Sequence, residues 1–197
     1  MPRRALFVDR DGTLCERPGS GAERHPLRLL PDAAASVRRL NQGGFQVIVV
    51  TDQPGVAFDE FDEDVLADAH EKLRLLLLEE GARLDGIYHC PHHPEGRIER
   101  YRSDCACRGP GTALFERARD EMGVDLAGSF FVCDSPLGLR AAASAGIRPI
   151  LVRVERTRES VARIEQLAGT SLDVVETLND AASLVLRSRA ATGVAVS

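Results

Sequence analysis

Ala5-Leu6-Phe7-Val8-Asp9-Arg10-Asp11-Gly12-Thr13-Leu14 is the stretch that decides the fold of this 197-residue chain. Its first four residues are apolar, and such a short apolar run is typical of a strand buried on both faces. Two aspartates one residue apart follow, and their side chains point to the same side of an extended segment. Ligands bind at the carboxyl ends of parallel strands, so one carboxylate could attack a substrate while the other transfers a proton. Two aspartates and a glycine also form simple acidic turns with no chemical role.

Apolar runs and longer helical patterns alternate along the rest of the chain. We expect strands at 5–8, 45–50, 130–132 and 150–152 and helices at 32–42, 63–80, 112–122 and 137–145. Each expected helix is followed by a glycine, a common helix stop. This order predicts an α/β fold with a Rossmann-like parallel sheet and helices on both faces. We expect one domain over residues 1–190 and a flexible tail at 191–197.

The composition narrows the classes of partner. The net charge is −5, so there is no basic excess with which to bind nucleic acid. No apolar run approaches the roughly 20 residues that cross a membrane, and the first residues do not resemble a signal peptide. Five cysteines, an odd number, do not indicate a secreted disulfide framework. We therefore expect a cytoplasmic protein that binds neither nucleic acid nor a membrane.

The segment 88–110 breaks the alternation of strands and helices but contains a metal-binding pattern. Cys90 and His92 are separated by one residue, as are Cys105 and Cys107. Three thiolates and one imidazole are the ligands of a closed tetrahedral zinc site, which would stabilise a loop too polar to pack alone. The alternatives are three unrelated reduced cysteines or a redox disulfide.

Four stretches, in this order along the chain, together resemble the motifs of the haloacid dehalogenase (HAD) superfamily of phosphatases. They are Phe7-Val8-Asp9-Arg10-Asp11-Gly12-Thr13-Leu14, Val49-Val50-Thr51-Asp52-Gln53, Cys107-Arg108-Gly109-Pro110 and Phe131-Val132-Cys133-Asp134. The loop sequence from Cys90 to Arg108 is similar to the capless branch that holds the heptose bisphosphate phosphatases and the histidinol phosphate phosphatases. The resemblance implies a HAD-like fold in which a zinc-stapled loop replaces a cap domain.

The resemblance also implies roles for the acids. Asp9 would attack phosphorus and become an aspartyl phosphate, and Asp11 would protonate the leaving group and then activate water. Mg²⁺ would be held by Asp9, the carbonyl of Asp11 and Asp134, and would offset the phosphate charge. Thr51 would hold oxygens of the transferring group.

Substrate contacts are expected around this centre. Arg108 follows the last zinc ligand directly and would receive a phosphate or sugar oxygen, with a part in catalysis. The other expected substrate-binding residues are Arg17, Gly19, Ser20, Asp52 and Gln53. The implied partner is a small phosphorylated metabolite, and we expect a monomer.

Three positions depart from the family pattern. Gly109 replaces a lysine, Gly138 replaces a second acid, and Asp52 replaces an asparagine. The site therefore loses a fixed cation and becomes more negative by one charge. We expect a magnesium-dependent phosphomonoester hydrolase acting on a small sugar phosphate. The alternatives are a phosphatase of an amine-bearing substrate such as histidinol phosphate, a catalytically impaired binding or regulatory protein, and a phosphotransferase.

Overall fold

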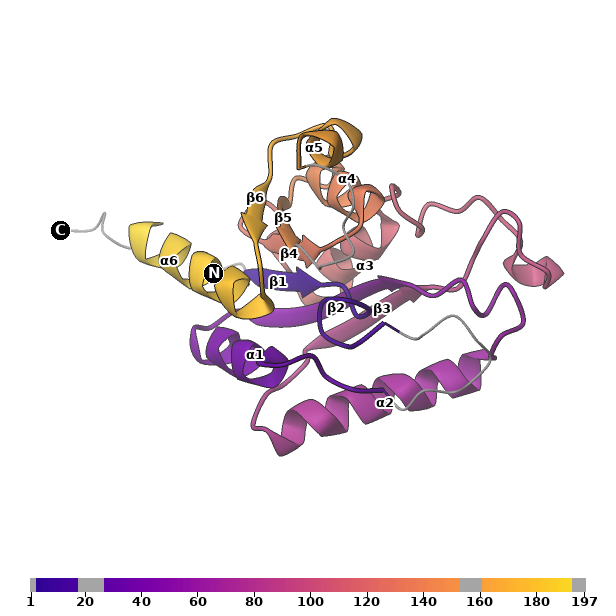
Figure 1. The fold of residues 1–197 in the computed structure, drawn as a ribbon, viewed down its shortest axis with the longest axis horizontal. Helices are drawn as coiled ribbons and strands as arrows, with labels where there is room; N and C mark the ends of the chain where they lie inside the picture. The colour runs from indigo at the N-terminus through magenta and orange to yellow at the C-terminus, as the bar shows by residue number, and fades with distance from the viewer. Residues whose placement is uncertain (1–2, 18–26, 153–160, 193–197) are drawn as a thin grey trace.

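The computed structural model describes residues 3–17, 27–152 and 161–192. Within these ranges six parallel strands form one sheet in the order β3-β2-β1-β4-β5-β6 (Figure 1). The strands are β1 (Ala5–Val8), β2 (Gln46–Asp52), β3 (Gly86–Cys90), β4 (Phe130–Cys133), β5 (Arg148–Val152) and β6 (Asp173–Val175). The helices are α1 (Ala33–Gln42), α2 (Glu63–Glu79), α3 (Ala113–Met122), α4 (Pro136–Ser144), α5 (Val161–Ala168) and α6 (Leu178–Thr192), with a 3₁₀ turn η1 at Glu99–Tyr101.

Helices cover both faces of the sheet, as the alternation predicts. Leu6 and Val8 of β1 belong to an apolar cluster with side chains of α1, α2 and α6. Phe7, which points to the opposite face, belongs to a second cluster with side chains of α3, α4 and α5. In that second cluster the ring of Phe115 lies edge-on to Phe7 and to Phe131, with centroids 5.2 and 5.1 Å apart. Burial on both faces explains why the β1 sequence is continuously apolar.

Several elements differ from the sequence-based expectations. The strand expected at 45–50 runs from Gln46 to Asp52. Residues 88–90, expected in an irregular loop, form the end of β3, an edge strand whose buried residues alternate with half-buried ones. The strand β6 and the helices α5 and α6 were not predicted. The helix α6 ends at Thr192, two residues into the expected tail, and residues 193–197 lie outside the described residues.

The sheet order places a crevice at the end of β1. The chain first adds β2 and β3 on one side of β1 and then adds β4, β5 and β6 on its other side, so the strand order reverses at β1. Such a reversal opens a ligand site at the carboxyl ends of the strands. The Asp9 N–H donates to the carbonyl of Val132 at 3.0 Å and carries the ladder one residue past β1. None of the helices described is both long and apolar enough to span a membrane.

Candidate active site and metal centre

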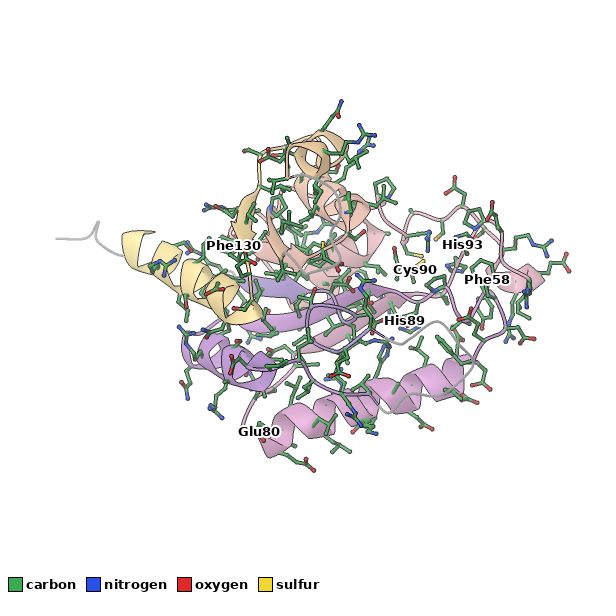
Figure 2. The ribbon with its side chains drawn as sticks, viewed as in Figure 1. Phe58, Glu80, His89, Cys90, His93 and Phe130 are labelled. Atoms are coloured by element: carbon green, nitrogen blue, oxygen red, sulfur yellow. The ribbon has the colours of Figure 1, made fainter. Side chains whose placement is uncertain are left out.

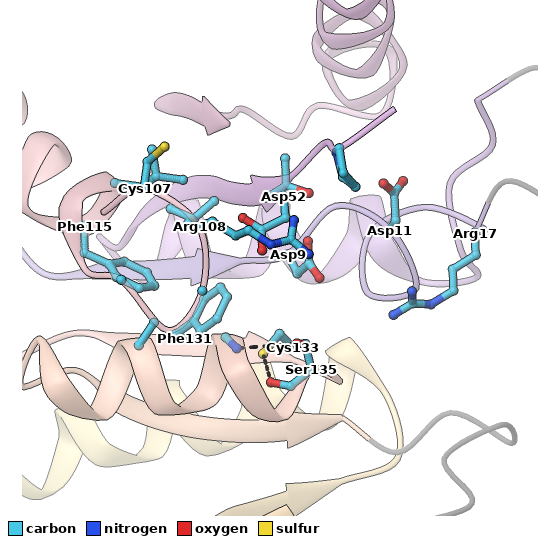
Figure 3. A pocket seen from close by; sticks show the side chains of 18 residues that line it. Asp9, Asp11, Arg17, Asp52, Cys107, Arg108, Phe115, Phe131, Cys133 and Ser135 are labelled. Atoms are coloured by element: carbon cyan, nitrogen blue, oxygen red, sulfur yellow. Dashed lines mark hydrogen bonds between the residues drawn. The ribbon is translucent and has the colours of Figure 1, made fainter. Parts of the chain in front are cut away.

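Asp9 lies at the crevice, in the wall of a pocket of about 290 Å³ (Figure 3). Its Oδ1 accepts the N–H of Arg10 at 2.7 Å, and its carboxylate is hydrogen-bonded to the hydroxyl of Thr51. Burial, followed by repulsion from Asp11 and Asp134, raises the pKa of Asp9 to about 7, against the opposing effect of these hydrogen bonds. The expected nucleophile is therefore placed among other acids and needs a cation to be fully ionised.

Asp11 is held by two side chains in a clamp. Arg10 donates from Nε and Nη2 to Oδ1 and Oδ2 of Asp11 at 2.9 and 2.8 Å, and Nη2 also donates to Gln53 at 2.7 Å. Gln53 in turn donates from Nε2 to Oδ2 of Asp11 at 2.8 Å. Both oxygens of Asp11 therefore act as hydrogen-bond acceptors in this arrangement. The clamp turns the Asp11 carboxylate away from Asp9 (Figure 3).

A buried histidine supports the clamp from α2. Nη1 of Arg10 lies 3.4 Å from Nε2 of His70. Because arginine has no acceptor, Nε2 must accept, and the proton of the ring belongs on Nδ1. Burial, followed by the charge of Arg10, lowers the pKa of His70 to about 3, so the ring remains neutral. Sequence reasoning missed Arg10 and His70, although His70 has the core spacing of the α2 face that includes Leu66, Leu73 and Leu77.

Asp134, at the end of β4, is paired with Arg17. Nη2 of Arg17 lies 2.5 and 2.6 Å from the two carboxylate oxygens of Asp134, whose side chain is only 6% exposed. Gly12 makes this approach available, since a Cβ there would lie 2.7 Å from Nε of Arg17 and the backbone has φ +87°. Asp9 and Asp134 offer the hard carboxylate oxygens that fit Mg²⁺. Arg17, expected at the substrate, instead lies on an expected metal ligand.

Asp52 and Arg108 face the same pocket from β2 and the loop 107–111. Burial raises the pKa of Asp52, while the charge of Arg108 and the N–H of Gly109 oppose the shift. Nη1 of Arg108 is buried and has no hydrogen-bond partner among the described residues. A buried guanidinium nitrogen without a hydrogen-bond partner destabilises the fold. A ligand oxygen that accepts from Nη1 of Arg108 would remove this cost.

The structure brings together most of the expected site but not all of it. Asp9, Asp11, Arg17, Thr51, Asp52 and Arg108 line the pocket. Gln53 contacts Asp11 and Thr51 and does not line the pocket. Gly19 and Ser20 lie outside the described residues.

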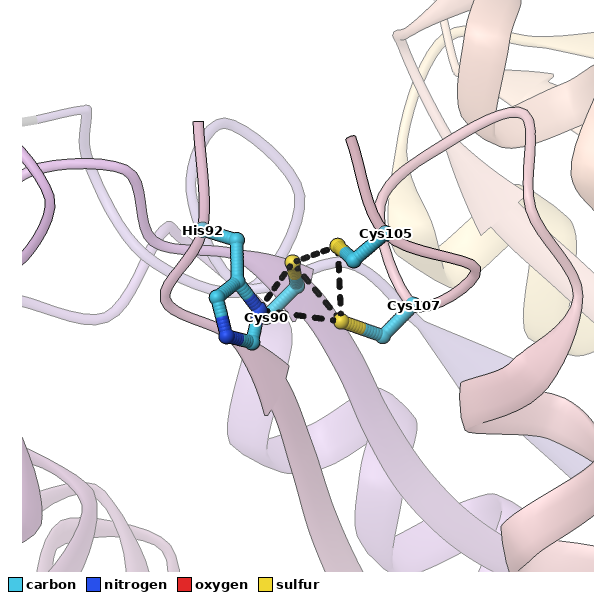
Figure 4. A group of neighbouring side chains, drawn as sticks. All are labelled: Cys90, His92, Cys105 and Cys107. Carbon is cyan, nitrogen blue, oxygen red and sulfur yellow. Dashed lines mark hydrogen bonds between the residues drawn. The ribbon is translucent and has the colours of Figure 1, made fainter. Parts of the chain in front are cut away.

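The four expected zinc ligands converge beyond the end of β3 (Figure 4). One ligand atom from each of Cys90, His92, Cys105 and Cys107 lies within 4.8 Å of the others. The sulfur atoms are 3.0 to 3.4 Å apart, and Nδ1 of His92 lies 3.3 Å from the Cys107 sulfur. Tetrahedral zinc with Zn–S bonds of about 2.3 Å requires ligand separations of about 3.8 Å, so small shifts would accommodate the ion.

The neighbouring histidines take no part in this cluster. The ring of His89 lies 5.3 Å from that of His70, and the ring of His93 lies 4.8 Å from that of Phe58 (Figure 2). Cys107 belongs both to the cluster and to the pocket wall, and Arg108 follows it. A metal ion bound by this cluster would therefore hold one wall of the pocket in place.

Comparison with known proteins agrees with this geometry. No family model matches the chain. It is 37% identical over 150 residues to the D-glycero-beta-D-manno-heptose-1,7-bisphosphate 7-phosphatase of Escherichia coli O6:H1, covering 76% of this chain and 79% of that protein. The protein of the same name from Vibrio cholerae is 31% identical over 188 residues, covering 95% and 98%. The solved structure of D,D-heptose 1,7-bisphosphate phosphatase from B. bronchiseptica, complexed with magnesium and phosphate, has a TM-score of 0.80 and 31% identity over 94% of this chain and 99% of that one.

Proposed function

The chain belongs to the heptose bisphosphate 7-phosphatase family of HAD phosphatases, and on this premise we propose that it is a magnesium-dependent phosphomonoester hydrolase acting on a small sugar phosphate. The observation that carries the proposal is the position of Asp9, at the strand reversal and in the pocket wall. Its relatives' names indicate a heptose bisphosphate as the first substrate to test.

Asp9 is the proposed nucleophile. Its carboxylate attacks phosphorus, the bond to the ester oxygen breaks, and an aspartyl phosphate forms. The hydroxyl of Thr51, which is hydrogen-bonded to Asp9, keeps the carboxylate oriented. The unpartnered Nη1 of Arg108 is available for an oxygen of the bound phosphate.

Asp11 is the proposed acid and base, and the clamp sets a condition on this role. With Arg10 and Gln53 on both of its oxygens, Asp11 is held as an acceptor. To protonate the leaving oxygen it must leave the clamp, turn towards Asp9 and deliver a proton. To assist hydrolysis of the aspartyl phosphate it must then take a proton from water. Rotation about the Asp11 side chain is therefore a proposed part of the cycle.

The residues also fit both proposed metals. Asp9, Asp134 and the carbonyl of Asp11 would hold Mg²⁺, which supplies charge neutralisation and a fixed orientation for the phosphoryl oxygens. Arg17 would then have to leave Asp134 and could contact the substrate, as the sequence predicts. Cys90, His92, Cys105 and Cys107 would hold structural zinc.

The main test is phosphate release from a panel of esters. Purified protein with Mg²⁺ is assayed on heptose 1,7-bisphosphate, sugar monophosphates, aminoalcohol phosphates and nucleotides, beside the nearly isosteric Asp9→Asn variant. We expect hydrolysis of sugar phosphates that disappears in Asp9→Asn and in magnesium-free buffer. Equal release by wild type and Asp9→Asn would mean a contaminating enzyme and would remove the proposal.

A second candidate is a catalytically impaired binding protein, and one observation favours it. Lys72 is the only lysine of the chain and lies exposed on α2, so no lysine can reach the phosphoryl site. Removing one fixed electrostatic stabiliser commonly lowers kcat by about 10²- to 10³-fold. Binding of inorganic phosphate without turnover of any ester would support this candidate.

A further inference from the structure

A second pocket lies at the opposite end of the sheet from Asp9. It has a volume of about 580 Å³, which is typical of small-molecule sites. Arg3 precedes β1, Gln46 begins β2, and residues 83–85 precede β3, so the pocket is at the amino ends of three neighbouring strands. Asp9, in contrast, follows the carboxyl end of β1. The two pockets share no lining residue.

Two side-chain amides line this second pocket, and each has one buried atom without a hydrogen-bond partner. Oε1 of Gln46 accepts no bond and Nδ2 of Asn41 donates none among the residues that the structure describes. Gln46 is only 9% exposed. Oδ1 of Asn41 accepts the N–H of Arg83 at 2.8 Å, which fixes the orientation of that amide. Buried polar atoms without partners are rare in folded proteins, and here one is an acceptor and the other a donor.

Two arginines stand at the rim of the same pocket. Arg3 is exposed, and its guanidinium forms no ion pair with any acid in the described ranges. Arg83 pairs with Oδ1 of Asp85 at 2.9 Å, but its side chain is 71% exposed and has further N–H groups to donate. Oδ2 of Asp85 already accepts the N–H of Val47 at 2.9 Å. With two cations and one acid, the rim favours an anion.

We propose that this pocket binds an adenosine phosphate, with the base edge at the two amides and the phosphate at the two arginines. Adenine has an N6 amino donor beside a ring-nitrogen acceptor, a pair that amide side chains recognise. N6 would donate to Oε1 of Gln46, and the ring nitrogen would accept from Nδ2 of Asn41. Both atoms are covered by neighbouring groups, so the base would reach them after a small rotation of each amide. Phe45 and Leu84 supply an apolar wall for the face of the base.

This site goes beyond the proposed phosphatase reaction and does not depend on it, so binding is measured where hydrolysis is blocked. The full chain with Asp9→Asn is titrated calorimetrically with adenosine 5′-monophosphate (AMP) in magnesium-free buffer. Purine riboside 5′-monophosphate lacks only the N6 amino group and should bind about tenfold more weakly. Adenosine and ribose 5-phosphate each lack one half of the contacts and should also bind more weakly. Equal affinity for AMP and purine riboside 5′-monophosphate would overturn the proposal.

Two substitutions locate the binding. Gln46→Met keeps the length of the side chain and removes the acceptor, so it should weaken AMP about tenfold and abolish the preference over the purine analogue. Because it also removes an unpartnered buried oxygen, it should not lower Tm. Arg3→Gln should weaken both nucleotides about tenfold and keep the preference. Arg140→Gln, which removes an exposed arginine that lines neither pocket, is the matched control and should leave both affinities unchanged.

The outcomes separate this inference from the proposed function. AMP binding that Gln46→Met and Arg3→Gln both leave unchanged would place the nucleotide elsewhere, for example at Asp9, and would overturn the inference. Absence of AMP binding would overturn it too, while Asp9-dependent hydrolysis of sugar phosphates would still support the proposed function. AMP binding that requires Gln46 and Arg3, in a protein that hydrolyses no ester, would support the second site and overturn the proposed function.

Discussion

The substitution Asp9→Asn should stabilise the metal-free protein, and by more at high pH than at low pH. Burial, and then the charges of Asp11 and Asp134, raise the pKa of Asp9 from 3.8 to about 7 in the folded state. The folded protein therefore holds the Asp9 proton more tightly than the unfolded chain does. As pH rises from about 4 to 7, the wild type loses free energy of unfolding, because ionisation costs more in the folded state. An asparagine does not ionise and avoids this loss.

The expected size follows from the shift. About three pKa units correspond to about 4 kcal/mol once pH exceeds the folded-state value. Asp9 is only half-buried, so screening by water should reduce this free energy of about 4 kcal/mol to about half. At pH 5 the wild type has already lost part of this free energy of unfolding. Between pH 5 and pH 8 the difference in unfolding free energy between Asp9→Asn and wild type should therefore grow by about 1 to 2 kcal/mol. The amide can still accept the N–H of Arg10.

Urea unfolding of metal-free, phosphate-free protein at pH 5 and pH 8 measures this difference. Asp104→Asn, which removes an exposed carboxylate, sets the baseline for losing one charge. An Asp9→Asn advantage that is equal at both pH values, or that shrinks as pH rises, would refute the burial argument.

Four further changes test the rest of the site. Cys105→Ser should open a metal-closed loop of about 15 residues and lower the free energy of unfolding by about 3 kcal/mol, which corresponds to a fall in Tm of roughly 6 to 12 °C. Trypsin should also cleave this variant faster. The control Cys15→Ala changes a buried cysteine outside the cluster and should keep one zinc per chain in native mass spectrometry. Asp134→Ala should raise the Mg²⁺ concentration for half-maximal activity at least tenfold; an unchanged metal titration would contradict its role. Gln53→Leu removes one of the hydrogen bonds that Asp11 must break before it can act, so kcat should stay the same or rise; a fall in kcat of about tenfold would contradict the proposed rotation of Asp11. Arg108→Ala should lower kcat by about 10² or more, and Arg108→Lys should recover part of it; a change confined to KM would make this residue a binding group only.

The sequence predicts the centre of the fold better than its edges. The strand 5–8 and its neighbours are buried on both faces, so their apolar runs are unbroken and easy to recognise. The edge strand β3 alternates burial and contains His89, which made it look irregular. The C-terminal elements β6 and α6 are short or weakly amphipathic, and only their packing on β5 and α1 defines them.

In the site, the sequence identifies the functional residues better than it predicts which side chains contact each other. Residue spacing was enough to propose Cys90, His92, Cys105 and Cys107 as ligands, and the structure brings one ligand atom of each to within 4.8 Å of the others. Spacing could not reveal that Gln53 and Arg10 bind Asp11, or that Arg17 lies on Asp134. Those pairings depend on side-chain directions that follow from the turn at Gly12 and from the neighbouring strand β2.

Because Arg108 directly follows Cys107, loss of zinc should affect phosphate binding and the stability of the sheet to different extents. The sheet and its two helical layers form apolar clusters, and of residues 91–107 only the partly buried Cys105 and Cys107 pack against them. Arg108, however, directly follows Cys107, which is one of the four proposed zinc ligands. Removing the metal would leave a folded sheet with Asp9 in place but with a loosened phosphate-binding arm. In a cell short of zinc, folded protein would then be present that binds phosphate poorly. The amount of protein would no longer indicate the amount of activity.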